Sequence, residues 1–107
     1  MTDISFQEVD QSTFSQYVRK MPISLGDTHH YSAAHNVWAP LVHDTDDNDW
    51  MGSLIYSEGE GQEILTVHHA QTEPKLKQKL RQSFKTDDTQ ERYKALLDGA
   101  TPENALT

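Results

Sequence analysis

Histidine has the broadest chemical capacity of the residue types in this chain, because imidazole both binds divalent metals and transfers protons near neutral pH. The sequence has six histidines and no cysteine, so a metal site could use only nitrogen and oxygen ligands. No HExxH or HxH motif is present. We therefore expect no cofactor. The alternative is a metal-binding protein or small metalloenzyme in which the fold brings four histidines to one divalent metal: His30, His35, His43 and His68.

The most acidic segment of the chain is DTDDND, which begins at Asp44. Its first, third and fifth positions match those of a calcium-binding EF-hand loop. The sixth position of such a loop is glycine, for a sharp turn, and here it is Asp49. The twelfth is a bidentate glutamate, and here it is Ile55. We interpret the segment as a solvated connection between strands, which can also serve as a contact surface.

A basic segment free of acidic residues covers positions 75–85. Leu76, Leu80 and Phe84 recur there at four-residue spacing, which predicts one apolar stripe along a helix. The basic side chains would flank this stripe. They form either a docking face for an acidic partner or a phosphate backbone, or a solvated helix face that balances the acidic segment, and we favour the solvated face. The basic residues are Lys75, Lys77, Lys79, Arg81 and Lys85.

The sequence has none of the local signatures of nucleophilic catalysis or nucleotide binding. It lacks cysteine, the GxSxG motif of hydrolases, the Walker loop and the GxGxxG turn. The glycines at positions 59 and 61 are typical of a tight turn between two strands. We therefore expect a protein that is not an enzyme.

The elements that must position these residues are predicted from periodicity and from residues that favour element ends. Residues 22–36 show no clear pattern. Strands are expected over residues 4–9, 37–43, 50–57 and 63–69, the last two forming a hairpin. Helices are expected to start at Asp10 or Ser12, at Thr72 and at Asp88, where Asp88 and Glu91 have capping-box spacing. Pro22 would end the first helix and Gly99 the last.

These elements predict an α+β fold: a small antiparallel meander of three to four strands, with an N-terminal helix and two C-terminal helices. We expect the helices to cover one face of the sheet. The length of 107 residues fits a single domain, residues 1–107. The N-terminus lacks the pattern of a signal peptide, and no apolar run is long enough to span a membrane. With no cysteine to form staples, we expect a cytoplasmic protein that does not enter a membrane.

Charge is distributed unevenly along the chain, whose net charge is -8. Residues 1–71 contain eleven acidic and two basic side chains, a net charge of -9, whereas residues 72–107 carry a net charge of +1. This acidity argues against general nucleic-acid binding, which requires a positive surface. It favours a protein partner with a basic surface, and an acidic face and a basic helix could also meet across a homodimer axis.

The leading hypothesis is a small non-enzymatic protein-binding or regulatory protein, an inhibitor or accessory factor of the kind that phages and other mobile elements encode. A specific form is an acidic decoy whose carboxylates mimic the phosphates of a nucleic acid. The remaining alternative is a nucleic-acid accessory factor that uses the basic segment 75–85. The residues expected to bind a protein partner are Asp44, Asp46, Asp47, Asp49, Trp50, Glu58, Glu60, Lys75, Lys77, Lys79 and Arg81.

Overall fold

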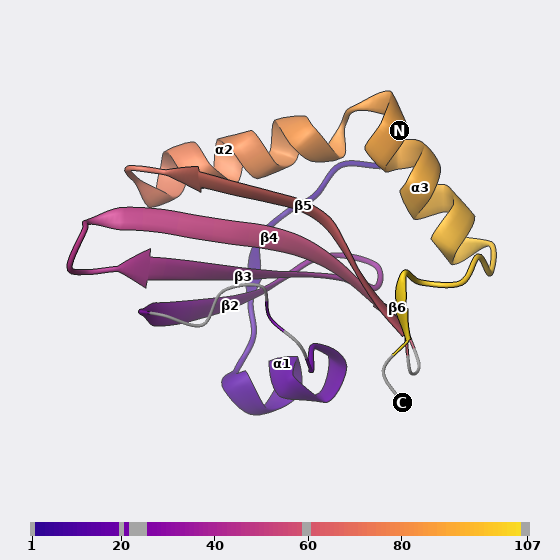
Figure 1. Cartoon of the computed structure of the whole chain (residues 1–107), viewed down its shortest axis with the longest axis horizontal. Helices are drawn as coiled ribbons and strands as arrows, with labels where there is room; N and C mark the ends of the chain where they lie inside the picture. Colours follow the sequence, from indigo (N-terminus) through magenta and orange to yellow (C-terminus); the bar gives the residue numbers. More distant parts are fainter. Residues whose placement is uncertain (1, 20, 22–25, 59–60, 106–107) are drawn as a thin grey trace.

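The sheet is an antiparallel meander, in which each strand pairs with the next strand in sequence (Figure 1). The computed structural model describes residues 2–19, 21, 26–58 and 61–105. The α+β class and the meander are confirmed, but the expected three to four strands are too few, because the described residues form a sheet of six strands. Four are long: β2 (Asp27–Ala34), β3 (Val37–Asp44), β4 (Asp49–Glu58) and β5 (Gly61–Ala70). Two are short edge strands: β1 (Gln7–Glu8) and β6 (Asn104–Ala105).

Among the long strands, the one that sequence patterns do not predict is β2, which lies within the segment that showed no clear pattern. Its sequence, DTHHYSAA, lacks the alternation of apolar and polar residues that marks a strand. It becomes a strand because β3 pairs along its length. The expected strand 4–9 shrinks to two residues, because the chain only crosses the edge of β2 there. Backbone bonds from Ser5 N to Ala33 O and from Val9 N to His30 O, each 3.0 Å, hold that crossing.

The helices lie on both faces of the sheet, so the expectation that they cover one face is wrong (Figure 1). The C-terminal helices α2 (Glu73–Phe84) and α3 (Asp87–Leu97) lie on one face, and α1 (Gln11–Tyr17) lies on the other. The cause is visible in β4, which is apolar on both sides. Leu54 belongs to the core cluster under α2, whereas Ile55 packs against Phe14 and Val18 at α1. A strand of this kind needs cover on both faces.

The apolar stripe of α2 is confirmed, since Leu76, Leu80 and Phe84 are each fully buried. Gly52 of β4 lies directly beneath this stripe. A Cβ atom at position 52 would lie 3.0 Å from Leu76 Cδ2 and 3.3 Å from Leu80 Cδ1. The missing side chain therefore sets how closely α2 approaches the sheet.

The helix ends agree with the sequence in part. Asp10 and Thr72 cap α1 and α2 as expected, by accepting bonds from the amides of Thr13 and Lys75. The cap residue of the last helix is Thr86 rather than Asp88, so the helix begins at Asp87, two residues earlier than the predicted cap implies. The reason is local, because the Thr86 hydroxyl donates to Ser83 O at 2.8 Å and so joins the two helices directly.

The chain leaves the last helix through a Schellman motif, as expected for Gly99. Gly99 N donates to Leu96 O at 3.1 Å, and Ala100 N donates to Ala95 O at 2.9 Å. Gly99 adopts a φ of 106°, which favours glycine. The first helix ends at Tyr17, earlier than Pro22 predicts. In the described part of the chain, no helix is both long enough and apolar enough to cross a membrane.

Candidate functional site

The acidic turn, residues 44–49 between β3 and β4, is folded around its first side chain. Asp44 Oδ1 accepts bonds from the backbone amides of Asp46 at 3.0 Å and Asp47 at 3.3 Å. Asn48 adopts a φ of 49°, a left-handed conformation that asparagine tolerates. This geometry leaves Asp46 and Asp47 exposed. In the described part of the chain, no cation forms an ion pair with either carboxylate.

An aromatic cluster of His29, His43 and Trp50 lies beside the acidic turn. The rings of His43 and Trp50 are stacked, with centroids 4.5 Å apart and planes inclined by 8°. His29 contacts the same indole at a centroid distance of 5.2 Å. His43 Nε2 lies 3.4 Å from Asn48 Oδ1, so the cluster is joined to the turn. Trp50, predicted as a contact residue, is therefore a half-buried ring held in place by its neighbours.

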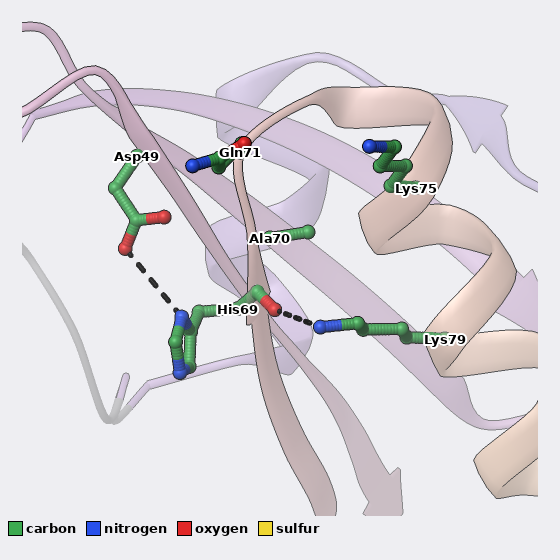
Figure 2. Close-up of a pocket in the computed structure, with 6 residues that line it drawn as sticks. All are labelled: Asp49, His69, Ala70, Gln71, Lys75 and Lys79. Atoms are coloured by element: carbon green, nitrogen blue, oxygen red, sulfur yellow. Dashed lines mark hydrogen bonds and ion pairs between the residues drawn. The ribbon is translucent and has the colours of Figure 1, made fainter.

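A charged groove of about 550 Å³ opens next to Asp49, where the start of β4, the end of β5 and the first turns of α2 meet (Figure 2). Asp49 Oδ2 lies 3.7 Å from His69 Nδ1, and Lys79 Nζ donates to His69 O at 2.9 Å. Lys75 lies one turn before Lys79, and its ammonium group has no bonding partner among the described residues. The groove therefore combines two cations with one carboxylate. Its lining residues are Asp49, His69, Ala70, Gln71, Lys75 and Lys79.

The basic residues of α2 divide into two groups, which the sequence could not separate. Lys77 and Arg81 interact within the fold: Lys77 Nζ pairs with Glu73 at 2.8 Å, and the Arg81 guanidinium lies 5.3 Å from the centroid of the Phe6 ring. Lys75 and Lys79 line the charged groove on the other flank of the helix. Lys75 and Lys79 are therefore the basic residues of α2 that face Asp49, whereas the exposed Arg81 lies on the side of Phe6. Two lysines beside a carboxylate make a poor phosphate-binding surface, which weakens the nucleic-acid alternative.

The predicted acidic residues do not form one surface. The acidic turn lies at one end of β4 and Glu58 at the other, roughly 30 Å away at about 3.3 Å per residue. Glu58 accepts a short hydrogen bond from the Tyr56 hydroxyl, and Glu60 lies outside the described residues. A decoy that mimics a long phosphate backbone would need these carboxylates in a continuous row. The arrangement instead favours a local contact at the acidic turn.

The four histidines predicted to hold a metal are not brought together. His30 packs against Phe14 on the α1 face, and burial lowers its pKa. His35 lies in the turn at the far end of β3 from His43, which stacks on Trp50. His68 is on β5, where its Nε2 is buried and has no hydrogen-bond partner among the described residues. Across the described residues, no group of three or more histidine, cysteine, aspartate or glutamate side chains is placed to hold a metal.

Sequence reasoning missed three residues that matter here. His29 contacts Trp50 and His69 lies in the charged groove, and neither belongs to the four histidines or the contact residues predicted from the sequence. The third is Glu63, whose carboxylate is buried against Arg92, 29 positions away. No local signal identifies a pairing over that separation.

Comparisons with protein-family models, curated proteins and solved structures found no match. Function therefore has to be inferred from this chain's own surface. The β3–β4 turn, the end of β5 and the start of α2 lie at the same end of the sheet (Figure 1). We call this end, with the acidic turn, the aromatic cluster and the charged groove, the charged end of the molecule. The side chains at this end could bind a partner through ion pairs and through contacts with the Trp50 ring.

Proposed function

We propose that this protein is a small non-enzymatic binding protein, an inhibitor or accessory factor, that holds a protein partner at its charged end. The observation that carries the proposal is the pair of exposed carboxylates on Asp46 and Asp47, which form no ion pair with any described residue and lie beside the stacked ring of Trp50. Aromatic side chains supply most of the energy of many protein interfaces, and surrounding charges supply orientation and speed of association. A cytoplasmic location forms part of the same proposal and rests on the absence of cysteine.

The partner should present basic side chains to the acidic turn. A net charge of -8 steers such a partner towards the protein at low ionic strength. Because exposed ion pairs contribute only about 0–1 kcal/mol each, the carboxylates alone would give a weak contact. Trp50 supports the proposal because its ring offers apolar area next to those charges.

The test is a titration with a fluorescent decalysine peptide, followed by anisotropy at low and at physiological salt. The variant Asp46→Asn/Asp47→Asn/Asp49→Asn removes three negative charges from the acidic turn. We expect it to lower the affinity about tenfold, which corresponds to about 1.4 kcal/mol. Binding by the unaltered chain should weaken as salt increases.

A matched control separates position from net charge. Asp88→Asn/Glu91→Gln/Asp98→Asn also removes three negative charges, from exposed positions in and just after α3. We expect this control to bind the peptide nearly as well as the unaltered chain. Equal losses in both triple variants would show that only net charge matters, and the proposed site would be wrong.

A further inference from the structure

We propose that a second copy of this chain is a partner of the charged end: the acidic turn of each protomer enters the charged groove of the other across a two-fold axis. This inference rests on the proposed function and names its partner. In such a contact, Lys75 and Lys79 of one protomer are the basic side chains that meet Asp46 and Asp47 of its partner. The dimer would be weak and sensitive to salt, because exposed ion pairs are screened.

The first reason is that each half of the contact has unused charge. Asp46 and Asp47 form no ion pair, and the ammonium group of Lys75 has no partner, among the residues that the structure describes. Lys79 Nζ bonds one backbone carbonyl, that of His69, which leaves two of its three donor hydrogens. A charge pair formed between protomers therefore breaks no ion pair within either one.

The second reason is position. Asp49 both ends the acidic turn and lines the charged groove, so the negative and positive groups adjoin on one surface (Figure 2). A two-fold axis passing between them brings each turn to the other protomer's groove, which is the self-complementary arrangement that a symmetric dimer requires. The groove volume of about 550 Å³ is large enough for a small ligand and can accept the carboxylates of a turn.

The third reason is that one-sided partners fit less well. A purely basic surface that covered the whole charged end, groove included, would meet Lys75 and Lys79 as well as the acidic turn, and like charges across an interface are unfavourable. A purely acidic surface would meet Asp46, Asp47 and Asp49. A second copy supplies both signs, at the spacing that the first copy presents.

The test is sedimentation velocity of the full chain over a concentration series, at about 20 mM and about 500 mM salt, where screening lengths differ several-fold. We expect a monomer–dimer equilibrium at low salt that shifts to monomer at high salt. The variants Lys75→Glu/Lys79→Glu and Asp46→Lys/Asp47→Lys should each be monomeric, because each places like charges across the contact. An equimolar mixture of the two should form a heterodimer, because both of its contacts then join opposite charges.

Controls keep the outcome independent of folding and net charge. The control for the groove variant is Arg19→Glu/Lys94→Glu, and the control for the turn variant is Glu91→Lys/Asp98→Lys. Each control has the same net charge as its variant but changes exposed positions elsewhere, so both should dimerise like the unaltered chain. Circular dichroism checks that every variant folds, and a single chain with all four reversals should dimerise on its own.

The inference would be wrong if the unaltered chain stays monomeric at low salt up to about 1 mM protein, a concentration well above the dissociation constants of most specific complexes. It would also be wrong if the equimolar mixture of groove and turn variants stays monomeric, or if either variant dimerises alone. Selective loss of decalysine binding by the turn variant, with a chain that stays monomeric, would leave the proposed function standing and remove only self-association. If Asp46→Lys/Asp47→Lys still dimerises and all variants bind the peptide equally, both the proposed binding site and the proposed dimer contact would be wrong.

Discussion

Glu63 and Arg92 form a two-pronged ion pair between β5 and α3. Arg92 Nε lies 2.7 Å from Glu63 Oε2, and Nη2 lies 2.5 Å from Oε1. The same carboxylate accepts a bond from Glu103 N at 2.9 Å, just before β6. The Glu63 side chain is only 7% exposed, whereas that of Arg92 is 41% exposed. One buried carboxylate therefore ties the sheet, the last helix and the C-terminal segment together.

Replacement of Glu63 by glutamine should destabilise the fold. The amide keeps the shape of the side chain but loses the charge that strengthens its hydrogen bonds to Arg92 and Glu103. We expect a loss of about 1 to 2 kcal/mol in the free energy of unfolding, measured by urea denaturation. Glu91→Gln, at an exposed site on α3, should change it by less than about 0.5 kcal/mol. An equal effect of the two substitutions would contradict the buried role of Glu63.

Stability at acid pH should depend on the same carboxylate. The Arg92 guanidinium, and then the amide of Glu103, hold the pKa of Glu63 below its ordinary value of 4.5. Between the folded and unfolded pKa values the unfolded chain binds more protons, so the stability that Glu63 contributes is complete above pH 4.5 and is lost as pH falls through the folded value. Urea midpoints measured from pH 6 downward should fall less steeply in Glu63→Gln. Identical slopes would show that other groups govern acid unfolding.

Tyr56 should titrate unusually late. Burial, followed by the hydrogen bond to Glu58, raises the pKa of Tyr56 to about 12. The same hydroxyl oxygen lies 3.2 Å from Leu96 O in the core. The folded state holds this proton longer than the unfolded state, so stability is complete below pH 10 and falls as pH rises towards 12. The stability of Tyr56→Phe should therefore fall less between pH 10 and pH 12 than that of the unaltered chain. Phenolate absorbance measures the ionisation of Tyr56 directly.

An alanine at position 52 should separate α2 from the sheet. The added Cβ would lie 3.0 Å from Leu76 Cδ2 and 3.3 Å from the Leu80 and Leu41 side chains. Overpacking of this kind costs about 1–3 kcal/mol, which thermal or urea unfolding would measure. Combining Gly52→Ala with Leu76→Ala should cost less than the sum of the two single changes, because the shortened side chain leaves room for the methyl group. Strict additivity would indicate that the two sites do not touch.

Trp50 should contribute to binding more than Trp38 does. Trp50→Leu keeps an apolar residue against the core but removes the ring that stacks on His43. We expect about a tenfold loss of affinity for decalysine and a matching loss of low-salt dimer. Trp38→Phe is the control, since Trp38 stacks on Tyr17 at the α1 face and should leave both measurements unchanged. If the two variants behave alike, the aromatic cluster is not part of the contact.

The parts of the fold that could be predicted from the sequence depend on neighbours within about a dozen residues. The stripe of Leu76, Leu80 and Phe84, the cap at Thr72 and the β4–β5 hairpin all follow from local periodicity and turn residues. The strand β2 could not be predicted, because its residues adopt extended structure only where β3 pairs with them. The placement of α1 on the opposite face depends on Ile55, far along the chain from Phe14.

The sequence by itself determined which side chains could do chemistry at the charged end: the carboxylates of the acidic turn, Trp50 and the basic residues of α2. Only the tertiary structure decided which of them remain available. The N-terminal segment places the Phe6 ring 5.3 Å from the Arg81 guanidinium, and the end of β5 brings Lys75 and Lys79 into the groove that Asp49 lines. The physical reason is that charge and ring contacts depend on distance in space, which local sequence patterns do not encode.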